Sequence, residues 1–203
     1  MINGLKEKIQ QHEGEFLCEA IGSEADKKVV KFSHLFEGPV ANLKVPQVGD
    51  VPDFYAAFGS LALFFCPESD EAAFYIARPD EWPALDEDFS GWVDLTDEDD
   101  QELLPAWFGD HFVVGEIPSS GNYLLIVTSG EEVGSVYEFE HDGFEFIKLA
   151  ASLDEFILKS LSPDVAAFSA MASHLRFISN DNDQQWWARE LRTNDGKVLR
   201  NED

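Results

Sequence analysis

Four short apolar segments follow one another between residues 112 and 149, and they constrain the fold more than any other feature of the chain. They predict β-strands over 112–117, 123–128, 135–140 and 144–149. The links between these segments are only three to six residues long. Strands joined by such short links pair antiparallel, because a parallel pair needs a crossover of a dozen residues or more. The sequence therefore predicts an antiparallel sheet.

The link between the last two strands, His141-Asp142-Gly143, predicts a tight turn. A two-residue turn there places Phe139 opposite Phe146, which is favourable. It also places Glu140 opposite Glu145, and like charges directly opposite each other destabilise a sheet. A longer or bulged loop would relieve the second pair.

Helical patterns flank these strands. Apolar residues at positions 2, 5 and 9 predict a short amphipathic helix at the start of the chain. Pro52 favours a helix over 52–58, because a proline is tolerated in a first helical turn. Two short segments around 16–21 and 28–32 are predicted strands. A third helical stripe consists of Trp82, Leu85, Phe89 and Trp92.

Capping residues indicate where further helices begin. Thr96 is a predicted cap for a helix over 97–104. Ser152 and Glu155 form a capping box that predicts a helix directly after the last strand. Ser162 and Pro163 predict the cap and first residue of another helix. Near the end, the turn pair at 195–196 predicts a hairpin between strands at 187–192 and 197–200.

These elements together predict an α+β fold with a central antiparallel sheet flanked by helices. The segment 1–50 is expected to be an N-terminal helix with short strands packed on the main domain. The segment 51–160 is the expected core domain, and 161–203 a C-terminal helix and tail. A chain of 203 residues can bury enough surface to fold without disulfide or metal support.

Negative charge is concentrated in the middle of the chain. The protein has 40 acidic and 14 basic residues, a formal net charge of -26. Residues 51–160 hold 25 acids and three bases, whereas 1–50 and 161–203 are each nearly balanced. Charges closer than the screening length add their fields and attract a partner of opposite sign. We therefore expect a basic protein partner, and we expect neither nucleic acid nor an anionic membrane surface to be bound.

The two cysteines and the N-terminus indicate the compartment. Cys18 and Cys66 lie 48 positions apart and match no metal spacing or disulfide framework. Residues 1–7 lack the basic and apolar regions of a signal peptide. The sequence therefore predicts a cytoplasmic protein with reduced cysteines, either a monomer or a weak homodimer.

The candidate interface is the segment 86–102, which holds nine acids in seventeen positions and no base. Trp82, Trp92 and Trp107 are candidate anchors, because tryptophan is favoured at interface hot spots. Two alternatives are structural: the acids at 97–100 suit a helix N-terminus, and the tryptophans suit the core. The candidate partner-binding residues are Asp86, Glu87, Asp88, Trp92, Asp94, Asp97, Glu98, Asp99, Asp100 and Glu102.

Signatures of catalysis and of metal binding are missing from the sequence. It has no Gly-x-Ser-x-Gly elbow, no phosphate-binding loop, no dinucleotide fingerprint and no His-Glu-x-x-His pair. The alternating ligands of a calcium loop are also missing. We therefore expect a non-catalytic protein without cofactor or metal.

Residues of about 51–160 resemble the SUKH superfamily, a group of bacterial immunity proteins that also includes a yeast cell-wall-synthesis regulator. The resemblance is carried by Pro52-Asp53-Phe54-Tyr55-x-x-Phe58, by the segments 121–126 and 134–139, by His141-Asp142-Gly143, and by the closing segment 150–157. The sequence departs from the family pattern at Asn122, where members often have a Gly-Asp pair, and in the segment 126–128, which lacks an Asp.

The resemblance implies an α+β domain that binds rather than catalyses. It implies an immunity protein that neutralises a polymorphic toxin, such as a nuclease, by stoichiometric binding. The alternative is a cytosolic adaptor or regulator that uses the same fold to bind a cellular partner. An unrecognised enzyme would instead require a concave pocket that contains carboxylates with shifted pKa values.

Overall fold

A computed structural model describes residues 2–41, 44–93, 98–179 and 184–201. Within these residues the chain has an α+β fold, with six helices and one antiparallel sheet of eleven strands. The helices are α1 (Ile2–Gln11), α2 (Val51–Ala57), α3 (Trp82–Ser90), α4 (Glu98–Leu103), α5 (Leu153–Leu161) and α6 (Val165–His174). The first strands are β1 (Gly14–Ala20), β2 (Ser23–Phe36), β3 (Leu61–Phe65), β4 (Phe74–Ile76), β5 (His111–Ile117) and β6 (Asn122–Val127). They are followed by β7 (Val136–Glu140), β8 (Glu145–Ala150), β9 (Arg176–Ser179), β10 (Gln184–Thr193) and β11 (Val198–Arg200).

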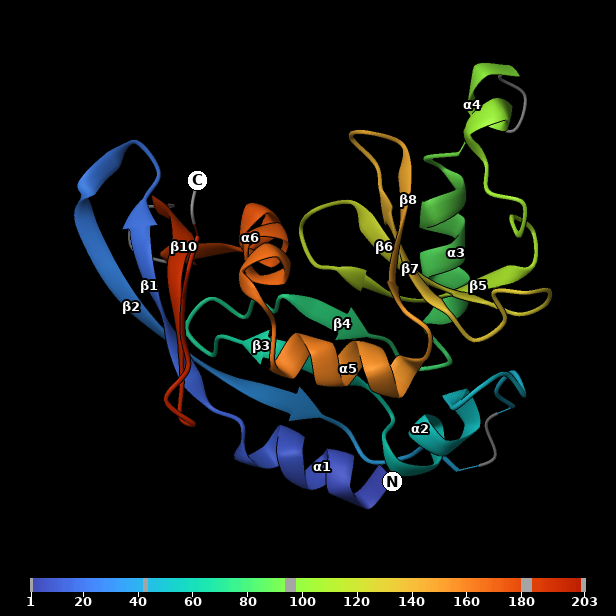
Figure 1. Ribbon diagram of the computed structural model, residues 1–203, viewed down its shortest axis with the longest axis horizontal. Helices are drawn as coiled ribbons and strands as arrows, with labels where there is room; N and C mark the ends of the chain where they lie inside the picture. Colours follow the sequence, from blue (N-terminus) through green and yellow to red (C-terminus); the bar gives the residue numbers. More distant parts are fainter. Residues whose placement is uncertain (1, 42–43, 94–97, 180–183, 202–203) are drawn as a thin grey trace.

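The sheet joins the two ends of the chain to its centre. Its strand order is β11-β10-β1-β2-β3-β4-β5-β6-β7-β8, and β9 pairs with β10. The long strand β2 makes the connection, because its first part pairs with β1 and its last residues pair with β3. β1 pairs on its other side with β10, so residues from both termini extend one edge of the sheet (Figure 1). The division of the chain at residues 50 and 160 stays a prediction.

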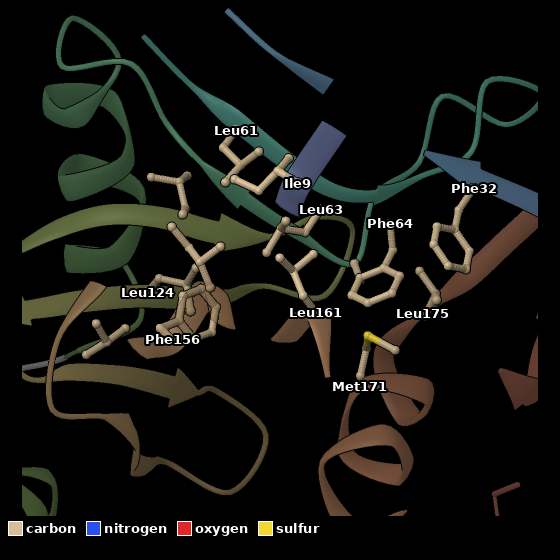
Figure 2. Close-up of a cluster of buried hydrophobic side chains, with 14 of the residues drawn as sticks. Ile9, Phe32, Leu61, Leu63, Phe64, Leu124, Phe156, Leu161, Met171 and Leu175 are labelled. Atoms are coloured by element: carbon tan, nitrogen blue, oxygen red, sulfur yellow. The ribbon is translucent and has the colours of Figure 1, made fainter. Parts of the chain in front are cut away.

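Buried side chains form two cores, one on each face of the sheet. The larger core lies under α1, α2, α5 and α6, and Figure 2 shows Phe64 of β3 and Met171 of α6 coming together in it. The smaller core lies between α3 and strands β5–β8. β6 contributes to both: Leu124 and Ile126 belong to the larger core, and Leu125 and Val127 to the smaller. Both faces of β6 are therefore apolar and buried.

The four predicted central strands are confirmed as β5–β8, which pair in sequence order. In the last hairpin Phe139 pairs with Phe146 and Glu140 pairs with Glu145, which is the register of the tight turn. The predicted tight turn is thus confirmed, and neither a longer nor a bulged loop separates the second pair. The Glu140 carboxylate instead accepts the backbone N–H groups of Asp142 and Gly143, so it stabilises the turn that brings it opposite Glu145.

The predicted cap is confirmed for α5 and wrong for α6. Ser152 accepts the backbone N–H of Glu155 and caps α5, as predicted. The predicted cap of α6 was wrong: Asp164 accepts the N–H of Ala167 at 2.8 Å, and the helix begins two residues later than expected, at Val165. An aspartate directly before the first turn competes successfully with the earlier serine. The predicted cap Thr96 lies outside the described residues.

Near the termini, one predicted strand is longer in the structure and the predicted C-terminal hairpin is present. β2 extends from Ser23 to Phe36, whereas only 28–32 was predicted, because the pattern after Phe32 is interrupted by polar residues. The C-terminal hairpin of β10 and β11 is confirmed, with Gly196 at a positive φ of 88° in its turn. Such a φ favours glycine, since it has no Cβ.

No helix in the described part of the chain is both long enough and apolar enough to cross a lipid bilayer.

Candidate functional site

Helix α3 presents one apolar and one acidic face. Leu85 and Phe89 are buried against the smaller core, as the predicted stripe requires. Because 3.6 residues make a turn, the residues between these two positions point away from the sheet. Asp86, Glu87 and Asp88 occupy those positions and are exposed. Three consecutive carboxylates therefore face the solvent on the outer side of α3.

The remaining predicted acids lie in or before the next helix. Glu98, Asp99 and Asp100 form the first half of α4, and Glu102 is exposed in its second half. Asp94 and Asp97 lie outside the described residues. The structure thus brings Asp86, Glu87 and Asp88 together on one surface, and it places the other four described acids on α4.

The three tryptophans have different environments. Trp107 is 9% exposed, and its ring packs against Tyr137 and Phe146 in the smaller core. Trp82 is half-buried between Tyr55 and Phe112. Trp107 is therefore a core residue, as the structural alternative requires, and Trp82 is partly buried against the core.

Trp92 is 48% exposed and lies just beyond the end of α3. Its ring centroid is 4.5 Å from that of His141, which belongs to the turn between β7 and β8. The His141 Nε2 atom is in turn 3.1 Å from a carboxylate oxygen of Asp142, which is exposed. The turn thus contacts the indole, about half of which stays exposed.

Further acids that the sequence did not single out join this surface. Glu116 of β5 is half-buried, and its pKa is raised by burial and by the nearby charges of Asp88 and Glu81. Burial lowers the pKa of His111, and the nearby charges of Asp86 and Asp110 oppose this shift. These couplings show that α3 and β5 contribute carboxylates to a shared field. Sequence spacing could not reveal this, because it depends on the packing of α3 across β5.

We name this surface the acidic face. It comprises Glu81, Asp86, Glu87, Asp88, Trp92, Asp110, Glu116 and Asp142.

Cations of β2 and β10 lie away from α3 and α4 (Figure 1). Strands β1, β2 and β10 lie at one end of its longest axis, whereas α3 and α4 lie at the other (Figure 1). At the first end Glu19 pairs with Lys27 at 3.2 Å and with Arg189 at 3.0 Å. The charge is therefore segregated in space as well as in sequence.

Close to the acidic face, the cation of Arg78 is engaged by two carboxylates. Its guanidinium contacts Asp80 at 3.0 Å and Glu37 at 2.9 Å. Neither α3 nor β5 contains a lysine or an arginine. The carboxylates of α3 therefore have no lysine or arginine beside them on their own helix or on the strand beneath it.

Three consecutive residues of the β7–β8 turn bring metal-ligating atoms together. Ligand atoms of Glu140, His141 and Asp142 lie within 4.8 Å of one another. Atoms of all three residues already take part in contacts of the turn: Glu140 accepts two N–H groups, His141 Nδ1 lies 2.9 Å from the side-chain oxygen of Asn122, and His141 Nε2 lies 3.1 Å from a carboxylate oxygen of Asp142. This arrangement accounts for the conformation of the turn without an ion.

Comparison with known proteins gives no assignment: no protein-family model, no curated protein and no solved structure matches this chain.

Proposed function

We propose that this protein is a non-catalytic binding protein that holds a basic protein partner on its acidic face. The observation that carries the proposal is the joint exposure of Asp86, Glu87 and Asp88 beside the half-exposed ring of Trp92. Complementary fields accelerate the encounter of two proteins. A large exposed aromatic ring then slows their separation, because its burial in the partner contributes to the lifetime of the complex.

We further propose that the partner is a toxin, such as a nuclease, which this protein neutralises by stoichiometric binding. Nucleases carry basic surfaces where they hold phosphates, so a field like that of the acidic face is complementary to them. The resemblance to the SUKH superfamily supports the same proposal. The second candidate is a regulator that binds a cellular partner through the same surface.

The test is capture of a partner from bacterial cells at two salt concentrations. Between about 50 mM and about 500 mM salt the Debye length falls severalfold, so electrostatic association should weaken strongly. We expect one basic protein to be recovered at the lower concentration. Its expression alone should arrest growth, and co-expression of this protein should restore it. A captured partner without toxicity would support the regulator instead.

Charge reversal locates the interface. The variant Asp86→Lys/Glu87→Lys/Asp88→Lys should lower the association rate constant at least tenfold, while changing dissociation less. A matched control reverses three exposed acids elsewhere, Glu7→Lys/Glu13→Lys/Asp26→Lys, and changes the net charge equally. Equal effects of the two variants would overturn the assignment of the acidic face. Trp92→Ala should mainly increase the dissociation rate constant.

A further inference from the structure

A cavity of about 140 Å³ lies between α5, α6 and the sheet, away from the acidic face. Most of its lining is apolar and includes Phe74, Ile117, Phe156 and Met171. Exposed residues of α6, Ala167 and Ala170, also line it. An apolar protein cavity of about 150 Å³ can hold a benzene molecule. The space therefore suits a small ligand with an apolar body of about one ring.

Two polar residues of the lining, Glu138 and His174, lie next to each other. Glu138 lies on β7 and is only 8% exposed, and its cross-strand neighbours, Leu124 and Ile147, are apolar. Its Oε1 atom accepts a hydrogen bond of 2.7 Å from the buried side-chain amide of Asn122. His174 Nε2 lies 3.7 Å from the same oxygen. A carboxylate is thus held in an apolar wall by one neutral amide and one imidazole.

The charges around Glu138 determine which ligand suits the site. Burial raises the pKa of Glu138, and the nearby charge of Glu140 adds to this, whereas Asn122 and His174 oppose it. No lysine or arginine forms an ion pair with Glu138 in the part of the chain that the structure describes. A buried carboxylate without a full countercharge is costly, and a cation would offset that cost.

The other polar residues of the lining are already engaged. Lys159 pairs with Glu155 at 3.0 Å, so its charge is compensated. The Ser160 hydroxyl donates to the Phe156 carbonyl at 2.9 Å. An anionic ligand would therefore meet the Glu138 carboxylate without an unpaired cation to hold it.

We propose that this cavity is a binding site for a small primary amine with an apolar body, whose ammonium group pairs with Glu138. The apolar body would lie against Phe156 and Met171, and His174 would orient the carboxylate. This site differs from the acidic face in its position and in the size of its ligand. The protein would then respond to a small cation independently of its macromolecular partner.

Titration of methyl-¹³C-methionine-labelled protein by NMR tests this site. The chain contains two methionines, and the signal of Met171 is assigned with the variant Met171→Leu. The probes are benzylamine, benzyl alcohol and benzoate. We expect benzylamine to shift the Met171 signal saturably, benzyl alcohol to bind at least tenfold more weakly, and benzoate not to bind. Equal affinity for benzylamine and benzyl alcohol, or no saturable shift with any probe, would overturn the proposal.

Two variants separate the site from the general attraction of cations to an acidic protein. Glu138→Gln keeps the shape of the side chain and should lower benzylamine affinity at least tenfold, without weakening benzyl alcohol. Glu145→Gln removes an exposed charge from the neighbouring strand and should leave both affinities unchanged. Unchanged benzylamine affinity in Glu138→Gln would refute the pairing. If that variant does not fold, Ala170→Phe provides a second test, because filling the cavity from its exposed side should abolish binding.

Discussion

The carboxylate of Asp50 accepts the backbone N–H of Asp154 at 2.7 Å, although the two residues are 104 positions apart in the chain. Its other oxygen accepts the N–H of Leu153 at 3.1 Å. A residue from the start of α2 therefore caps the first turn of α5, together with Ser152. This contact fixes two helices of the larger core relative to each other.

Asp50→Ala should lower the free energy of unfolding by about 2 kcal/mol, because two N–H groups at a helix N-terminus lose their acceptor. The measurement is chemical denaturation at neutral pH. Asp154→Ala is the matched control, since it removes one charge from the same place. Burial and the charges of Asp50 and Asp53 raise the pKa of Asp154, so its removal should be neutral or stabilising. A larger loss with Asp154→Ala than with Asp50→Ala would contradict this account.

A second prediction concerns the pH dependence of stability and rests on His34. Its Nδ1 atom accepts the backbone N–H of Phe64 at 3.0 Å, so the proton of the neutral ring is on Nε2. That atom lies 2.8 Å from Nδ1 of His12. Burial, together with the nearby charge of His12, lowers the pKa of His34 to about 3. The folded protein thus keeps His34 neutral, whereas the unfolded chain takes up a proton near pH 6.5.

The stabilisation by neutral His34 is therefore complete above pH 6.5 and is lost as the pH falls toward 3. At pH 5 the loss amounts to about 2 kcal/mol. His34→Asn keeps an acceptor for Phe64 and cannot ionise. The difference in unfolding free energy between the wild-type protein and His34→Asn should shrink by about that amount between pH 7.5 and pH 5. A difference that stays constant across this range would show that His34 is not the responsible group.

Local sequence signals predicted the central part of the fold because each of them acts over a few residues. Apolar segments joined by short links predicted β5–β8, and Ser152 caps α5 through an N–H only three residues away. The extension of β2 could not be predicted this way. There the side chain of His34 replaces a backbone acceptor for Phe64, whose φ is 55°. This side-chain-to-backbone hydrogen bond depends on β2 and β3 lying side by side, which the local sequence does not reveal.

The candidate site was predictable only in part, for a similar reason. The acids of α3 were recognised because they are consecutive and unbalanced by bases. Glu116 and Glu138 were not, since each is a single acid in an apolar strand, and a solvent-facing position is the usual interpretation of that pattern. Whether such a residue is covered depends on helices from elsewhere in the chain: α3 packs across β5, and α6 supplies His174 next to Glu138.

A third prediction concerns the contact between β4 and β5. A Cβ atom on Gly115 would lie 2.0 Å from the carbonyl oxygen of Tyr75, at an irregularity in the pairing of β5 with β6. Gly115→Ala should therefore lower the free energy of unfolding by about 3 kcal/mol, because backbone atoms must move apart. Gly4→Ala is the matched control: no atom lies within 4 Å of the new Cβ, and the position is helical. It should stabilise the protein by about 1 kcal/mol. Thermal and chemical denaturation of both variants measure these effects, and equal stabilities would contradict them.

The final prediction concerns the β7–β8 hairpin, where two acids face each other. Glu140 is retained opposite Glu145 because its carboxylate accepts two N–H groups of the turn, and Glu145 makes no such contribution. Glu145→Lys should therefore stabilise the protein by about 0.5 kcal/mol at low salt, since it converts a repulsive pair into an attractive one. Glu140→Lys makes the same exchange of charge on the other strand. It should destabilise the hairpin, because the N–H groups of Asp142 and Gly143 lose their acceptor. Chemical denaturation of both variants measures these effects. If both variants were more stable than the unchanged protein, charge alone would determine the stability of this turn.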